Sequence, residues 1–340
     1  MLSELRERVR QGSLDFAWRQ WAQAGVAADI ASFDRSAIDP EALILFTIEV
    51  ARRDPRLFDE VLDWMAVNRH LLSTQRLRNL SRRFPVDPQL VGAVIAWTED
   101  QRLSAVREPG SARDHRLEMR PVFTRDVLSY IGEPDPVFEE YGYVRPRVIR
   151  SLKSRDPDPK IVANFAFLLR HLFGPGSRSE VMRVLLTFSN GPLDAARISD
   201  ESGFAKRNIN DTLSGLVSSR TVKARRSRNE RVFVAYRDKW ADLLEVGPSA
   251  EFMPVFVSWV HLLPAFTEVV EWLDGMAETE YSEYMISSSA RDLIGRIAPD
   301  LEAAGLDIGQ KTRSHGEAYL STFVDIVDAI LSIAGAGHGQ

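Results

Sequence analysis

Apolar residues recur every three or four positions over most of the chain, which is the spacing of one face of an α-helix. Three Asp-Pro pairs, which begin at Asp39, Asp54 and Asp87, mark helix starts in the first hundred residues. In each pair the carboxylate can cap the helix, and the proline suits the first turn because that position needs no backbone N–H. The pattern therefore predicts a helical domain over residues 1–98.

Similar spacing returns in the second half of the chain. It predicts a helix over 160–173 that ends at Gly174, and three further helices after residue 250. Alternation of apolar and polar residues, the pattern of a strand, is concentrated between 221 and 236. We therefore expect a mainly α, multi-domain helical protein with one small β-hairpin. The expected helices after residue 250 are 252–276, 278–304 and 316–334.

Residues 177–218 carry signals for three consecutive helices. Ser177 and Glu180 match a capping box at the start of the first helix. Asp194 is the expected cap of a short second helix, which Gly203 ends. The third helix is expected over Lys206–Ser218, with one buried apolar stripe and a polar face on the opposite side. The stripe consists of Ile209, Leu213 and Leu216.

Two β-rich pieces follow, Thr221–Arg225 and Arg231–Tyr236, and a basic turn joins them into a predicted hairpin. Charge is concentrated in the same region: residues 203–237 carry a net charge of +7, whereas the chain as a whole carries −5. A cationic block in an acidic protein suits an anionic partner, and a solvated basic loop is the alternative. The nine cations are Lys206, Arg207, Arg220, Lys223, Arg225, Arg226, Arg228, Arg231 and Arg237.

The order of helix, short helix, sharp turn, polar helix and basic hairpin resembles the winged helix-turn-helix, broadly of the MarR or ArsR type. The similarity spans residues 178–237. Three positions depart from the family pattern: Ala205 stands where a Ser or Thr cap is usual, Arg220 where a Gly is usual, and Ser199 where an Ala is usual. Besides the hairpin, the resemblance rests on Ile198, Gly203, Ile209, Leu213, Leu216 and Val222.

The resemblance implies that the third helix enters the major groove of double-stranded DNA, where its first polar residues reach base edges. Arg pairs with guanine and Asn with adenine, so Arg207, Asn208 and Asn210 are the candidate readers. Lys206 lies at the helix start, where a phosphate is favoured. The alternative is that these side chains form a solvated face. The hairpin completes the expected DNA-binding set with Lys223, Arg225, Arg226, Arg228 and Arg231.

Sequence motifs for catalysis and for metal binding are missing. The chain has no cysteine, which excludes disulfides, thiolate zinc sites and a cysteine nucleophile. The six histidines show no ligand spacing, and neither a P-loop nor a GxSxG motif occurs. His171 and His261 lie among apolar neighbours and are expected to be hydrogen-bonded core or interface residues. We therefore expect neither an enzyme nor a bound metal or cofactor.

These observations predict a cytoplasmic, bacterial-type transcription regulator that binds specific DNA sequences as a homodimer. We expect no signal peptide and no membrane span, because no apolar run is long enough. The apolar helix 316–334 is the expected dimer contact. The alternative is a component of a toxin–antitoxin or defence assembly whose winged helix docks a protein partner. The expected parts are an N-terminal helical domain at 1–98, a loop or linker at 99–120, a helical connector at 121–177, the winged helix-turn-helix at 178–240 and a C-terminal helical domain at 250–336.

Overall fold

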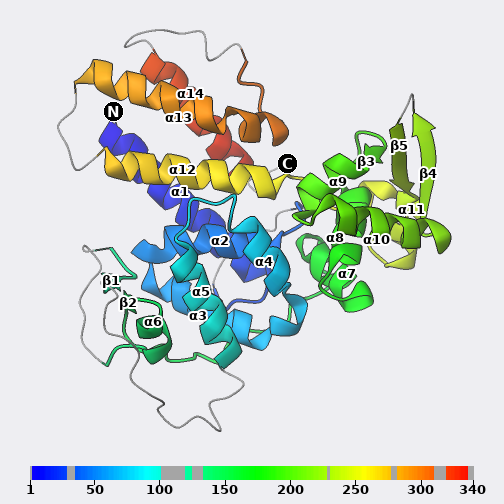
Figure 1. Ribbon diagram of the computed structural model, residues 1–340, viewed down its shortest axis with the longest axis horizontal. Coiled ribbons are helices and arrows are strands. Elements are labelled where there is room, and N and C mark those ends of the chain that lie inside the picture. The colour runs from blue at the N-terminus through cyan, green and yellow to red at the C-terminus, as the bar shows by residue number, and fades with distance from the viewer. Residues whose placement is uncertain are drawn as a thin grey trace.

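The computed structural model describes residues 2–28, 35–100, 119–124, 133–227, 230–276, 282–309 and 319–335. Most of this part of the chain is helical (Figure 1). The α-helices are α1 (Leu2–Gln23), α2 (Pro40–Val50), α3 (Pro55–Val67), α4 (Thr74–Leu80), α5 (Pro88–Asp100), α6 (Pro136–Glu140), α7 (Phe165–Phe173), α8 (Ser177–Thr187), α9 (Ala195–Ser202), α10 (Lys206–Ser218), α11 (Arg237–Leu243), α12 (Trp259–Gly275), α13 (Glu283–Ala303) and α14 (Tyr319–Gly335). Short 3₁₀ helices are η1 (Ala51–Arg53), η2 (Arg69–Leu71), η3 (Val162–Asn164) and η4 (Ala250–Phe252). The strands are β1 (Arg120–Pro121), β2 (Tyr143–Val144), β3 (Leu193–Asp194), β4 (Val222–Ser227) and β5 (Glu230–Ala235). The predicted mainly α fold is confirmed.

The chain folds around two separate hydrophobic cores. The larger core takes side chains from both ends of the chain and also includes Phe167. We call residues 2–164 and 257–335, which supply the rest of this core, the helical body. The smaller core is built from residues 165–256, which we call the hairpin unit because it contains the β4–β5 hairpin. In Figure 1 the hairpin unit forms the right-hand side of the molecule.

Helix α2 lies at the centre of the helical body, and every one of its residues is buried. Its residues are apolar on nearly all sides, and such a helix is stable only when other helices surround it. Helices α1, α3, α4, α5 and α12 pack around it. Asp39 caps α2 by accepting a hydrogen bond from the backbone N–H of Ala42, as the Asp-Pro pattern predicts.

The C-terminal helices belong to the same core as the N-terminal ones. Helix α14 packs against α1 and α13, and α12 packs against α2 and α1. The sequence predicts separate domains at 1–98 and 250–336, but their buried side chains form one continuous core. The apolar stripe of α14, which includes Phe323 and Ile330, is buried within its own chain. The pattern that suggests a dimer contact is therefore satisfied without a second copy.

The hairpin unit contains a three-stranded antiparallel sheet in the order β3–β5–β4. The predicted hairpin corresponds to β4 and β5, in which Val222 pairs with Ala235 and Arg226 with Arg231. The sequence did not indicate β3, which adds only two residues to the far edge of β5. Helices α8, α9 and α10 pack together beside this sheet.

The predicted linker at 99–120 lies largely outside the described residues, although α5 reaches Asp100 and β1 begins at Arg120. The predicted helical connector at 121–177 is only partly helical. Between β2 and η3 the chain runs without regular secondary structure. This stretch contains three prolines, which cannot donate a backbone hydrogen bond and therefore oppose helix formation.

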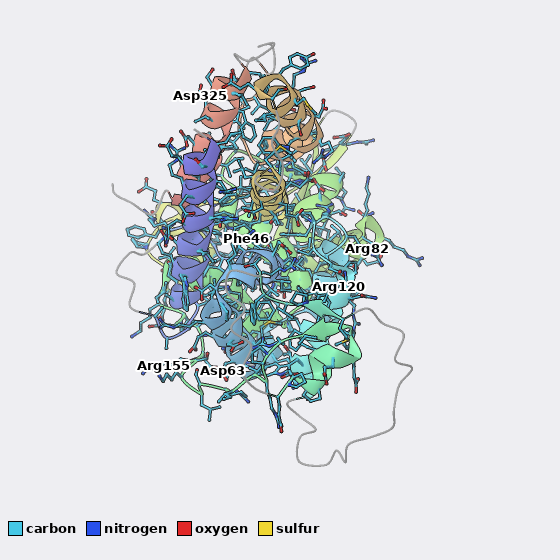
Figure 2. The ribbon with its side chains drawn as sticks, turned by 90° about the vertical axis from the view of Figure 1, so that its left-hand side faces the viewer. Phe46, Asp63, Arg82, Arg120, Arg155 and Asp325 are labelled. Carbon is cyan, nitrogen blue, oxygen red and sulfur yellow. The ribbon has the colours of Figure 1, made fainter. Side chains whose placement is uncertain are left out.

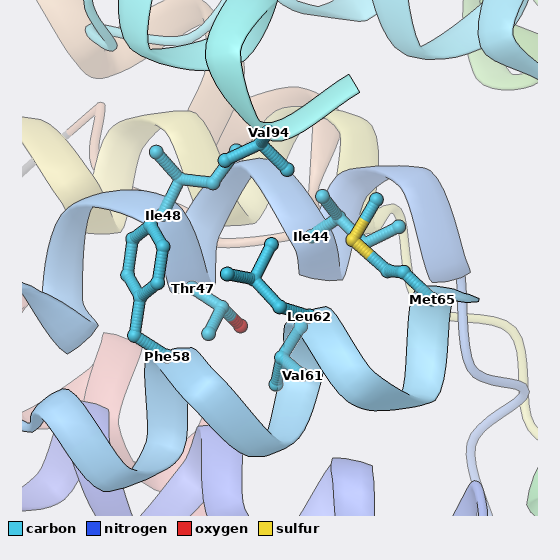
Figure 3. A pocket seen from close by; sticks show the side chains of 8 residues that line it. All are labelled: Ile44, Thr47, Ile48, Phe58, Val61, Leu62, Met65 and Val94. Atoms are coloured by element: carbon cyan, nitrogen blue, oxygen red, sulfur yellow. The ribbon is translucent and has the colours of Figure 1, made fainter. Parts of the chain in front are cut away.

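A small cavity lies inside the helical body between α2, α3 and α5 (Figure 3). Its free volume is about 10 Å³, which is near the minimum for a single water molecule. Thr47 supplies its only polar lining, and the Thr47 hydroxyl already donates to the carbonyl of Leu43 and accepts from the Trp21 indole. The cavity is therefore a packing gap that is too small for a metabolite.

Among the helices in the described ranges, none combines the length and the hydropathy that a transmembrane segment requires.

Candidate nucleic-acid interface

Local signals in the sequence set the boundaries of α9. Asp194 accepts a hydrogen bond from the backbone N–H of Arg197 at 2.8 Å and so caps the helix start. Gly203 ends the helix in the left-handed conformation, with φ +69°, which glycine adopts without steric cost. A three-residue turn, Gly203 to Ala205, then leads into α10. Both features agree with the helix ends predicted from the sequence.

The start of α8 differs from the prediction. The Ser179 hydroxyl, and not Ser177 with Glu180, exchanges hydrogen bonds with the backbone of Gly176 at the helix start. Glu180 is buried and instead accepts hydrogen bonds from Arg170 and Arg183. The capping-box assignment is wrong because ion pairs inside the protein hold this carboxylate away from the helix end.

Helix α10 has two distinct faces. Ile209, Leu213 and Leu216 are buried in the core of the hairpin unit, as the apolar spacing predicts. The opposite face is exposed to solvent and carries polar side chains from the first turn onward. The body does not cover this face, so a groove of a nucleic acid can reach it. The exposed residues are Lys206, Arg207, Asn210, Asp211, Ser214 and Ser218.

The two candidate asparagine readers differ in their surroundings. Asn210 is exposed on the outer face of α10. Asn208 is only partly exposed, and its side-chain oxygen accepts a hydrogen bond from the Thr212 hydroxyl at 3.4 Å. That hydroxyl also bonds to Ser177 at the start of α8, at 2.7 Å. Asn208 therefore lies on the side of the helix that faces α8, and Asn210 is better placed to contact a base.

Arg220 connects α10 to β4 with a positive φ of +61°. This residue stands where the winged-helix pattern has glycine. A left-handed backbone costs a residue with a Cβ atom about 1–2 kcal/mol. Helix α10 also begins without a side-chain cap, because Ala205 at the N-cap position has no hydrogen-bonding group. Arg220 and Ala205, which both depart from the winged-helix pattern, are therefore positions where the local backbone is less stable than the usual residue would make it.

Exposed cations are concentrated on the β4–β5 hairpin. Arg226 lies directly opposite Arg231 in the pairing register, and like charges in that position repel each other. The Arg231 guanidinium also lies over the Phe233 ring, 5.3 Å from its centroid. Together with Arg225, these residues line a hollow in the surface. Arg228, another predicted hairpin contact, lies outside the described residues.

The exposed cations of α10 and the hairpin have no acidic partners within the described ranges of the chain. Lys206, Arg207, Lys223 and Arg225 all extend into solvent. An unneutralised group of cations produces a positive potential that attracts anions. This set, together with Arg226 and Arg231, forms what we call the basic face.

A buried charge network lies between the two cores. It consists of three carboxylates and three guanidinium groups, all at most 3% exposed. Burial alone would raise the carboxylate pKa values, but the adjacent arginines outweigh it and lower the pKa of Asp39 and of Glu180. Asp39 and Glu180 are therefore charged at neutral pH. The members are Asp39, Glu41, Arg76, Arg170, Glu180 and Arg183.

The helical body also holds the end of α9 through its backbone carbonyls. Arg76 Nε donates to the carbonyl of Ser202 at 2.6 Å, and Asn79 donates to that of Gly203 at 3.2 Å. The Leu80 side chain lies so close to Gly203 that an added Cβ would come within 2.7 Å of it. Helix α4 is therefore in direct contact with the turn that precedes α10.

His261 on α12 forms a second polar link to α9. Its Nε2 lies 2.9 Å from Asp200, and its Nδ1 lies 2.6 Å from Asp300 on α13. Burial would lower the pKa of His261, but the two carboxylates outweigh it and raise the pKa to about 9. The predicted interface position of His261 agrees with this geometry. His171 differs, because its side chain is exposed and lies near His70.

Neither polar link has a signal in the sequence, because its members are far apart along the chain. Within the described ranges, no three His, Asp or Glu side chains converge in an arrangement that could hold a metal ion. Comparison with protein-family models, with curated proteins and with solved structures finds no match to this chain.

Proposed function

We propose that the hairpin unit is a winged helix-turn-helix and that the protein is a transcription regulator that binds double-stranded DNA through it. The observation that carries the proposal is the basic face: unpaired cations on a hairpin beside the exposed polar face of α10. The order α8, β3, α9, α10, β4, β5 supports the same assignment.

In the proposed complex, α10 lies in the major groove. Arg207 and Asn210 face the base edges, where Arg selects guanine and Asn selects adenine. Lys206 contacts a phosphate at the helix start. Arg225, Arg226 and Arg231 on the hairpin contact the phosphate backbone or the adjacent minor groove.

The test measures binding of a labelled mixed-sequence duplex by fluorescence anisotropy at increasing salt. Because each phosphate contact releases counterions, the wild-type affinity is expected to fall steeply between about 50 and 200 mM salt. Replacement of Arg225, Arg226 and Arg231 with glutamine is expected to weaken binding and to flatten the salt dependence.

A matched control replaces Arg147 and Lys153, two exposed cations between β2 and η3, with glutamine. This control removes positive charge away from the basic face and is expected to bind like the wild type. Equal binding by the wild type and the hairpin variant would refute the proposal. Co-purification with a second polypeptide in place of nucleic acid would favour the protein-docking alternative.

A further inference from the structure

Helix α4 of the helical body carries its own row of exposed polar side chains. Gln75, Arg78 and Arg82 follow one another at spacings of three and four residues, so they lie on one face of α4 and the turn after it. All three are exposed. Figure 2 shows Arg82 at the outer edge of the molecule. The opposite face of α4, with Arg76, Leu77 and Leu80, is buried.

The contacts of α4 place its C-terminal end next to the start of α10. Asn79 donates to the Gly203 carbonyl, and Leu80 touches Gly203. Gly203 lies only three residues before Lys206, the first residue of α10. Arg83, after the end of α4, bonds to the carboxylate of Asp200 at 2.7 Å. The end of α4 therefore adjoins the end of the hairpin unit where the polar face of α10 begins.

Arg78 and Arg82 differ from the neighbouring arginines in whether they form ion pairs. Arg76 and Arg83 form ion pairs with Asp39 and Asp200. Within the described part of the chain, Arg78 and Arg82 pair with no carboxylate. Their charges thus add to the positive potential of Lys206 and Arg207 on the other side of the turn.

We propose that Arg78 and Arg82 form a second phosphate-binding surface, which contacts the DNA backbone beside the groove that α10 occupies. This inference rests on the proposed function. The major groove is about 12 Å wide, so a surface beside the first turn of an inserted helix faces the phosphates at its edge. Because polar contacts fix α4 to the turn before α10, the body and the hairpin unit bind one duplex as a single surface.

The proposal predicts an effect on affinity without an effect on sequence preference, because phosphates carry no base information. The variant Arg78→Gln/Arg82→Gln is compared with the wild type on a mixed-sequence duplex at several salt concentrations. Loss of two phosphate contacts is expected to weaken binding roughly tenfold and to reduce the salt slope by about 1–2. The bases selected from a random duplex library are expected to stay the same.

Two further variants test whether the loss of affinity is due to the positive charges of Arg78 and Arg82. Arg78→Lys/Arg82→Lys keeps the charge and is expected to restore most of the affinity and the salt slope. The Arg147→Gln/Lys153→Gln control is expected to match the wild type. Because both arginines are exposed, the thermal midpoint of each variant is expected to stay near that of the wild type, which a melting curve checks.

Three outcomes would overturn the inference. If Arg78→Gln/Arg82→Gln binds like the wild type while the hairpin variant loses affinity, the second surface is wrong and the proposed function stands. If the glutamine variant binds more tightly, α4 hinders the duplex. If the wild type shows no salt-dependent DNA binding, the proposed function fails, and the inference fails with it.

Discussion

Arg76 on α4 and Ser202 at the end of α9 are joined by a 2.6 Å hydrogen bond from the guanidinium Nε to the backbone carbonyl. The other nitrogens of the same guanidinium bond to Asp39 and Glu41. One buried side chain thus links the charge network of the helical body to the turn before α10. The orientation of α10 relative to the body therefore depends on Arg76.

We predict that Arg76→Met strongly destabilises the protein. Methionine fills a similar volume but leaves buried carboxylates without their cation, which costs about 3–5 kcal/mol. Urea denaturation measures the change in the free energy of unfolding. The control Arg82→Met removes an exposed cation and is expected to change this free energy by at most about 0.5 kcal/mol. A loss below about 1 kcal/mol for Arg76→Met would contradict the role given to the network.

The stability contributed by His261 is expected to depend on pH. The pKa of His261 is about 9 in the folded protein, whereas an unperturbed histidine has a pKa of 6.5, so the folded protein binds the proton more tightly. The contribution is therefore complete below about pH 6.5 and is lost as the pH rises to about 9. Its size is on the order of 2 kcal/mol, because the partners Asp200 and Asp300 are partly exposed.

The measurement compares the wild type with His261→Gln by denaturation from about pH 6 to about pH 9.5, a range that spans both pKa values. Other charged groups around His261, which include Glu201 and Arg83, remain in both proteins. The difference between the two free energies of unfolding is expected to shrink as the pH rises. A difference that is constant with pH would exclude titration of His261 in this range.

Arg220→Gly is expected to stabilise the fold by about 0.5–1 kcal/mol, because glycine adopts a positive φ without the cost of a Cβ atom. Part of that gain is offset by the greater freedom of glycine in the unfolded chain. The control Arg220→Ala removes the same charge but keeps the Cβ atom. Thermal denaturation that shows an equal gain for both variants would trace the effect to charge and not to the backbone.

Asn210→Ala and Asn208→Ala are expected to differ in a DNA-selection experiment. If Asn210 reads a base, its removal relaxes the preference at one position of the selected sequences, by about 1–3 kcal/mol. Asn208 is engaged with Thr212, so its removal is expected to leave the preference unchanged. The reverse result would show that α10 contacts DNA through the side that faces α8.

Phe323→Ala is expected to destabilise the protein by about 3–5 kcal/mol without changing its molar mass in solution, because the ring is buried within its own chain. Denaturation and light scattering measure the two quantities. The control Asp325→Ala alters an exposed side chain on the same helix (Figure 2) and is expected to change neither. A folded Phe323→Ala variant with half the wild-type mass would instead assign α14 to a dimer contact.

The helix ends and strands that the sequence predicted are those whose hydrogen-bond partners or apolar pattern lie within a short stretch of the chain. Asp39 and Asp194 cap their helices through backbone N–H groups three residues away, so a short stretch of sequence contains both partners. The alternation of Val232 and Val234 with their neighbours similarly indicated a strand. Within the candidate site, the polar face of α10 and the hairpin cations are exposed, as the sequence pattern predicts.

The remaining features depend on partners that are distant in sequence. Glu180 fits a helix cap when only its neighbours are considered, yet it pairs with Arg76 on another helix. The apolar spacing of α14 shows which face is buried but not what covers it, and in this chain α1 and α13 cover it. For the same reason, the contact of α4 with Gly203 had no signal in the sequence.

The chain enters and leaves the hairpin unit at one place. Ala163, just before the unit, accepts a hydrogen bond from Ile38, and Val255, at its end, donates one to Arg35. The hairpin unit is therefore an insertion between two halves of a single helical domain. During synthesis it emerges from the ribosome before α12, which covers α2. The hairpin unit can therefore complete its hydrophobic core before α12, α13 and α14, the last three helices of the helical body, have been synthesised.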